Sequence, residues 1–115
     1  MSRQAVRFPA LIAVLVNRVL HGPGTTSALL RQVVAARAGA LGGARRAPAS
    51  LPAELAPYVD RLAQQPGTVG GSDIAALRLA GYSEEEIFEL TVSVALGASL
   101  ARLERGLAAL QEAET

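Results

Sequence analysis

The chain has no cysteine, no lysine and no tryptophan, and it has a single histidine, His21. Without cysteine it can form no disulfide, no thiolate metal site and no thiol redox centre. Without lysine it lacks the amine of Schiff-base chemistry and the lysine of a Walker-type phosphate loop. Because no second histidine could share a metal or activate a nucleophile, we expect His21 to cap a helix C-terminus. We therefore assign no catalytic, cofactor-binding or metal-binding residue.

Long apolar runs are missing as well. No uncharged run approaches the ~18 to 20 apolar residues that a membrane-spanning helix needs. The basic start and the following run LIAVLV are similar to a signal peptide, but the run is short and Asn17 and Arg18 interrupt it. We expect a protein that does not contact the membrane and is located in the cytoplasm.

The first half of the chain contains no acidic residue. Residues 1–53 carry seven arginines and no acid, whereas residues 54–115 carry four arginines and ten acids, so the halves have net charges of +7 and −6. Opposite charges favour packing of the two halves, within a subunit or head to tail between subunits. A nucleic-acid surface is the alternative, but Arg31, Arg37, Arg45 and Arg46 lack interleaved aromatic residues and a recognition motif. We do not expect nucleic-acid binding.

The strongest local pattern is Tyr82 to Leu110, which predicts one long helix. Ser83 and Glu86 have the spacing of a capping box, in which each side chain bonds a backbone amide of the first turn. The apolar positions of this helix go all the way round the cylinder, which is typical of a helix buried on every side. Gly97 in mid-helix costs ~1 kcal/mol relative to alanine, a cost that close packing of a neighbouring helix could offset. We expect this to be the core helix.

The remaining residues predict four shorter helices and no strand. Residues 1–8 are expected to be a loose arm, and Pro9 then suits the first turn of a helix that ends near Leu20. The run GPGTT is similar to an anion-binding loop but lacks the rest of a phosphate fingerprint, so we expect a turn in which Thr25 or Thr26 caps the next helix. That helix should stop at Gly39.

The Gly-, Ala- and Pro-rich stretch 39–50 is the expected linker between two helical halves of a single domain, residues 1–115. Leu51, Leu55, Tyr58 and Leu62 then recur at helical spacing, up to a stop at Pro66. Ser72 is the expected cap of a further short helix, which Gly81 closes in a left-handed conformation. The predicted fold class is all-α, with about five helices and a long buried C-terminal helix.

Residues 58–110 resemble the C-terminal part of the alkylhydroperoxidase D-like, or carboxymuconolactone decarboxylase-like, superfamily. The likeness rests on DIAALRLAGYSEEEIFELTVSVALGASLARLERGL, a short helix followed by an acidic capping box and an uncharged, small-residue helix. It implies an alkylhydroperoxidase D-like helical bundle and a tendency to oligomerise. Redox-active members use a Cys-x-x-Cys pair with a nearby histidine and glutamate. This chain matches no part of that motif, so thiol peroxidase activity is excluded.

Glu89 is the acid whose role is hardest to assign from position alone. It lies at the edge of the uncharged segment, so it could be partly buried with an arginine partner, or it could be a functional carboxylate. The other acids lie at helix starts or on solvated faces, where a structural role explains them.

Two main functions follow. The first is a non-catalytic helical subunit that acts in oligomer assembly or binds a small ligand. The second is a cofactor-free, cysteine-independent enzyme acting on a small carboxylate, which arginines such as Arg31 or Arg37 would clamp. For the first we expect a homo-oligomer, most simply a dimer or trimer, because the long helix has more apolar surface than short helices can cover. Its interface is predicted to be the ladder of Phe88, Val92, Leu96, Leu100, Leu103 and Leu107, with Val94, Ala98 and Ala101 packed inside the subunit.

Overall fold

The computed structural model describes residues 3–41 and 51–114, with side chains described for residues 10–40 and 51–114. The described residues form five α-helices and one 3₁₀ turn, with no strand: α1 (Arg3–His21), α2 (Ala28–Leu41), α3 (Ala56–Gln64), η1 (Pro66–Thr68), α4 (Gly71–Leu79) and α5 (Glu84–Glu114). The all-α prediction and the long C-terminal helix are confirmed. The expected linker 39–50 lies mostly outside the described residues, which resume at Leu51.

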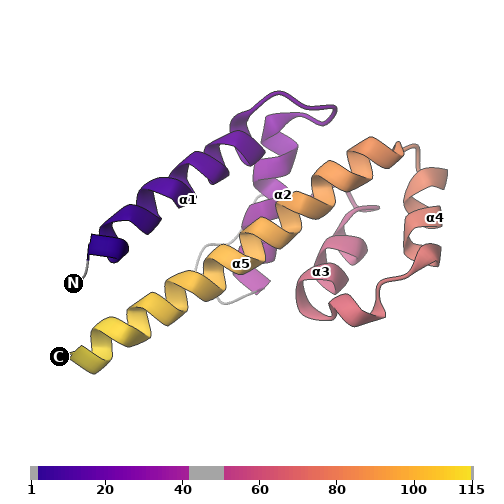
Figure 1. Cartoon of the computed structure of the whole chain (residues 1–115). Helices are drawn as coiled ribbons and strands as arrows, with labels where there is room; N and C mark the ends of the chain where they lie inside the picture. Colours follow the sequence, from indigo (N-terminus) through magenta and orange to yellow (C-terminus); the bar gives the residue numbers. More distant parts are fainter. Residues whose placement is uncertain (1–2, 42–50, 115) are drawn as a thin grey trace.

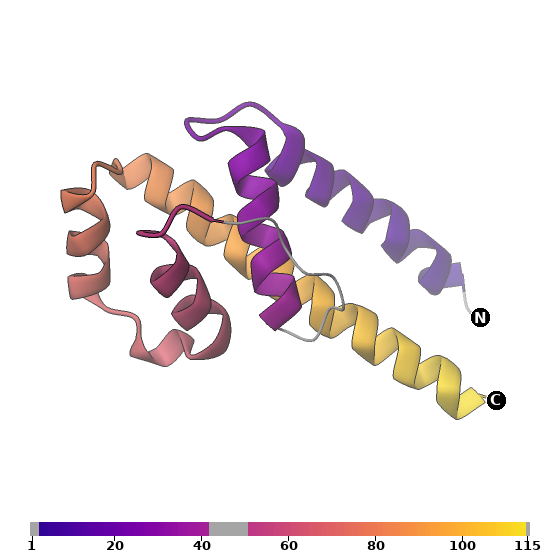
Figure 2. The same ribbon diagram turned by 180° about the vertical axis from the view of Figure 1, so that it is seen from behind.

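Helix α5 is the axis of the molecule, and α2 crosses it near its middle (Figure 1). Helices α3 and α4 pack near the first half of α5, while α1 lies on the other side of α2. The N-terminus of α1 and the C-terminus of α5 are at the same end of the molecule in both views (Figure 2). The second half of α5 therefore extends beyond the helices that cover its first half.

The contact between α2 and α5 forms the centre of the core. Val34 and Ala38 of α2 are fully buried, and Val94 and Ala98 of α5 are buried with them. A Cβ atom built on Gly97 would lie 2.1 Å from the carbonyl oxygen of Ala35, so only a glycine lets the two backbones approach this closely. The structure thus supplies the close packing that was expected to offset the cost of Gly97.

Both ends of the α4–α5 connection have the geometry that the sequence predicts. Ser83 Oγ accepts a hydrogen bond from the amide of Glu86 at 3.1 Å, and the Glu86 carboxylate accepts one from the amide of Ser83 at 2.9 Å. Gly81 has a φ of +106° and the amide of Tyr82 bonds the carbonyl of Leu77 at 3.1 Å, which is the Schellman ending of α4. These local bonds set where α4 ends and where α5 begins.

Two predicted boundaries of the first half differ from the structure. Helix α1 begins at Arg3 and includes most of the expected loose arm, with Pro9 inside the helix, where it leaves the Ala5 carbonyl without a helical donor. Helix α2 continues past Gly39 to Leu41, because Gly39 does not have the positive φ that ends a helix.

Two predicted caps are also wrong. Helix α2 is capped by Ser27, whose Oγ accepts from the amide of Leu30 at 3.1 Å, instead of by Thr25 or Thr26. Helix α4 begins after Gly70 instead of at Ser72, and Asp73 accepts from the amide of Gly70 at 2.9 Å. At α2 the cap is the serine next to the two predicted threonines, and at α4 the acid at the third helical position bonds the amide of the residue before the helix.

The expectation that α5 is buried on every side is wrong. Its buried side chains end at Ala101, and nearly all residues from Arg102 to Glu114 are exposed. The reason is length: α5 has 31 residues, more than the shorter helices can cover.

Replacing Gly97 by alanine tests the central contact. The new methyl group would collide with the Ala35 carbonyl, so α2 and α5 would have to separate, and we expect Gly97→Ala to lower the free energy of unfolding by about 1 to 3 kcal/mol. Ser99→Ala is the control, because Ser99 is exposed on the same helix and should change stability by less than about 0.5 kcal/mol. Urea denaturation followed by circular dichroism measures both. Equal stability of the two variants would mean that the backbones are not in close contact.

Candidate functional site

The predicted interface residues all lie on one side of α5, and none belongs to the core. Phe88 is 69% exposed, Leu107 is 45% exposed and Leu103 is also exposed, whereas the ladder residues between them are partly buried. Val94, Ala98 and Ala101, the residues expected inside the subunit, are buried. The small-residue face of α5 is therefore buried, whereas the ladder is exposed at both of its ends and partly covered in between, where Val92 and Leu100 lie beside α1.

The exposed end of α5 is polar on one side and apolar on the other. The positions that continue the core-facing stripe beyond Ala101 are occupied by Glu104, Arg105, Ala108 and Glu112, so that side suits water. The ladder side remains apolar to its end, where Leu110 is 63% exposed. Sequence reasoning missed Leu110, although it continues the spacing of Leu103 and Leu107.

Helix α1 adds a second group of exposed apolar residues, which the sequence did not single out. Leu11, Val14 and Leu15 are each at least half exposed. Their spacing places them on one face of the helix, and this spacing was the available signal. Like Leu103, Leu107 and Leu110 of α5, they are large apolar side chains that the described fold leaves in water.

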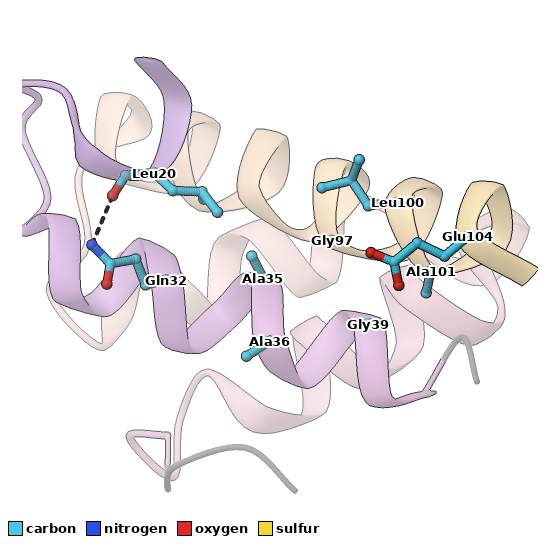
Figure 3. A pocket seen from close by; sticks show the side chains of 9 residues that line it. All are labelled: Leu20, Gln32, Ala35, Ala36, Gly39, Gly97, Leu100, Ala101 and Glu104. Atoms are coloured by element: carbon cyan, nitrogen blue, oxygen red, sulfur yellow. Dashed lines mark hydrogen bonds between the residues drawn. The ribbon is translucent and has the colours of Figure 1, made fainter. Parts of the chain in front are cut away.

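A shallow groove lies where α1, α2 and α5 meet (Figure 3). Its volume is about 280 Å³, and its lining is mostly small or apolar, with Leu20 and Leu100 on opposite sides of Ala35 and Gly97. The polar side chains of the groove are Gln32 and Glu104, and the Gln32 amide already donates to the Leu20 carbonyl at 3.1 Å. The groove thus has few free polar groups with which to orient a small substrate.

Glu89 connects α5 to the turn between α1 and α2. Its Oε2 accepts from the amide of Thr25 at 2.7 Å, and its Oε1 accepts from the amide and the hydroxyl of Thr26 at 2.8 and 2.6 Å. A Cβ atom on Gly24 would lie 2.7 Å from Oε1, so the glycine leaves room for the carboxylate. The GPGTT turn therefore does bind an anion, and that anion is a side chain of the same protein.

The pKa of Glu89 reflects these bonds. Partial burial raises the pKa, but the hydrogen bonds from the hydroxyl and amide of Thr26 and from the amide of Thr25 outweigh it and lower the pKa from 4.5 to about 2. The carboxylate is consequently charged at neutral pH and fully engaged, which is the state of a structural group instead of a proton-transferring one.

The arginine that pairs with Glu89 is Arg31, which the sequence did not single out for this role, and it is 4% exposed. Its Nε lies 4.0 Å from Glu89 Oε1, while its terminal nitrogens donate to the carbonyls of Val19 at 2.5 Å and Gly22 at 2.6 Å. These carbonyls belong to the end of α1 and the residue after it, so Arg31 caps that helix from inside the protein. Both halves of the expected ion pair thus hold the α1–α2 turn against α5.

Arg37, the other arginine considered as a carboxylate clamp, already holds a carboxylate of its own chain. Its Nε and Nη2 donate to the two oxygens of Asp60 at 2.6 and 2.8 Å, a bidentate pair between α2 and α3. The hydrogen bond to Asp60 raises the pKa of Arg37. Arg45 and Arg46, which completed the arginine-rich group, lie outside the described residues.

His21 is the last residue of α1, and its Nδ1 is 3.1 Å from the Gln32 amide nitrogen. Within the described ranges no three histidine or acidic side chains come close enough to hold a metal ion. None of the helices in those ranges combines the length and apolar character required to cross a bilayer. No family model matches the chain, and no curated protein or solved structure is similar enough to count as a match.

Removing the charge of Glu89 tests its structural role. In the native protein its stabilising effect is complete above about pH 4.5 and is lost as the pH falls toward its lowered pKa of about 2. Glu89→Gln should lower the free energy of unfolding at pH 7 by about 1 to 3 kcal/mol, because the new NH₂ group would face the threonine donors. It should also remove part of the pH dependence between pH 4.5 and 2. Thermal unfolding across this range gives both quantities.

Glu85→Gln is the matched control, because Glu85 is an exposed glutamate in the first turn of α5. It should keep the native pH dependence below pH 4.5. If both variants unfold with the same pH profile as the parent, Glu89 does not hold the turn.

Proposed function

We propose that this protein is a non-catalytic helical subunit that assembles into a homo-oligomer, most simply a dimer or trimer, through the apolar ladder of α5. The observation that carries the proposal is the ladder's exposure beyond Ala101, where apolar side chains stay in water while the opposite side of the same helix is charged. Exposed apolar patches of this extent are unusual on monomers and are typical of interaction surfaces.

The surface area of the chain supports a partner. Its solvent-accessible surface is 7578 Å², whereas a compact monomer of 11.9 kDa has about 6,000 Å². The excess of about 1,600 Å² exceeds the ~800 Å² that each partner contributes to an interface of standard size. The radius of gyration points the same way, because it is 15.4 Å where a compact domain of this length has about 13 Å.

The arrangement of polar groups favours assembly over catalysis. Arg31 and Arg37, which could have held a small acidic substrate, bond groups of their own chain, and so does Glu89, the candidate functional carboxylate. The resemblance to the alkylhydroperoxidase D-like superfamily agrees with an oligomeric helical subunit, and we propose it as the family to which the fold is related. Binding of a small ligand remains compatible with an assembled protein, in which two subunits could enclose the groove beside Leu100.

Sedimentation of a charged variant tests the proposal. The parent should sediment as a dimer or trimer at micromolar concentration, and Leu107→Arg should shift it to the monomer mass because an arginine cannot be buried unpaired in an apolar contact. Ala109→Arg is the control, since Ala109 is exposed on the same helix but away from the ladder, and its mass should equal the parent's. Circular dichroism should show that all three are folded.

Two results would contradict the proposal: a monomeric parent at high micromolar concentration, or an equal loss of mass in the two arginine variants. Repeating the runs at high salt separates the causes of association. A contact between apolar ladders should persist, whereas a head-to-tail contact between the basic and acidic halves should weaken.

A further inference from the structure

We propose that the partner of α5 is α5 of a second copy, packed antiparallel to it, with the two Gly106 residues facing each other across a two-fold axis. This inference rests on the proposed function, and it adds which segments meet, in which direction and at which residue.

Gly106 is the first observation. It lies inside α5, where glycine costs ~1 kcal/mol relative to alanine, and a Cβ atom built on it would have no neighbour within 4 Å. The other glycine of this helix, Gly97, is explained by the Ala35 carbonyl of the same chain. The described fold gives Gly106 no such reason. A helix of another molecule passing close to it supplies one.

The spacing of the ladder is the second observation. Its last five leucines follow alternate steps of four and three residues, which is the seam of a coiled coil: Leu96, Leu100, Leu103, Leu107 and Leu110. Reversing such a seam brings Leu103 against Leu107 of the second copy, and Leu100 against Leu110 of the second copy. The same pairs recur on the other side of the axis, so the segment is complementary to itself, as a two-fold contact requires.

The flank of the seam on the Gly106 side is small and uncharged. Ser99, Gly106 and Ala113 recur there at intervals of seven residues, so two antiparallel helices can approach closely along this flank. Glu104 adjoins the seam on the opposite flank. Because the two helices are closest on the Gly106 flank, they are further apart on the Glu104 flank, which leaves room for this side chain. Arg105 and Glu112 lie away from the seam and bond each other at 3.4 Å. The antiparallel pair therefore buries no charge in its centre.

The absence of cysteine makes the test clean, because any disulfide must come from an introduced residue. In Gly106→Cys the two thiols would be adjacent across the axis, and we expect a covalent dimer to form under mild oxidation at low micromolar concentration. Ala109→Cys is the matched control, on the same exposed helix but off the seam, and should cross-link at least ten times more slowly. Non-reducing electrophoresis over time gives both rates.

The direction of the helices is tested by mixing two variants. Leu100→Cys and Leu110→Cys should form mainly the mixed disulfide, which mass spectrometry distinguishes from the two symmetric ones. Gly106→Leu provides a measurement without thiols. If Gly106 is exposed to solvent, this change would leave the mass in solution unchanged. If Gly106 contacts a second helix, the change should weaken association at least tenfold while the monomer remains helical.

The outcomes separate this inference from the proposed function. A parent that is oligomeric, together with equal cross-linking at residues 106 and 109, would overturn the antiparallel pairing and leave the assembly proposal standing. A trimeric parent, or symmetric disulfides in the mixture, would do the same. A monomeric parent would overturn both.

Discussion

The close approach of α2 to α5 at Gly97 is the contact on which the other features of this fold depend. Because a Cβ atom there would meet the Ala35 carbonyl at 2.1 Å, the two helices pack backbone against backbone. Their side chains near the crossing are correspondingly small, and the aliphatic groups of α2, α3 and α5 fill the space around it. A core made mostly of alanine, valine and leucine, with few aromatic residues, needs this proximity to reach the packing density of a folded protein.

The polar residues of the interior extend this contact to the rest of the chain. Glu89 holds the amides of the α1–α2 turn, Arg31 holds the carbonyls at the end of α1, and Arg37 joins α2 to α3 through Asp60. Each of these charged side chains bonds groups of the protein itself, which lowers the cost of placing charges away from water, although Arg31 Nε makes no hydrogen bond and only lies 4.0 Å from Glu89 Oε1. The charged groups considered as candidate catalytic or binding residues therefore hold helices in place. The exposed part of the α5 ladder has no such role within the chain.

That surface arises from a difference in length. Helix α2 and the short helices cover α5 as far as Ala101, but the apolar ladder continues to Leu110. The core-facing stripe of α5 becomes polar beyond Ala101, where the other helices no longer cover it, whereas the ladder stays apolar. A sequence that changes on one side of a helix and not on the other is consistent with two different surroundings, water on the first side and a partner on the second.

Local signals determined much of this structure from the sequence alone. The capping box at Ser83, the left-handed Gly81 and the division of α5 into a small-residue face and a leucine ladder follow from residues a few positions apart, and so does the all-α class. These interactions join residues within one or two helical turns, so the spacing of residues in the sequence is enough to predict them.

The tertiary structure decided what depends on residues far apart in the chain. Ser27 caps α2, while the amides of Thr25 and Thr26 and the Thr26 hydroxyl bind Glu89, more than sixty residues away. Gly39 stays helical inside the packed region instead of ending α2. The periodicity of α5 could not predict how far along its length the helix is covered. Its pattern shows only which side of the helix is suited to burial, whereas the lengths and positions of the other helices decide which part of that side is buried.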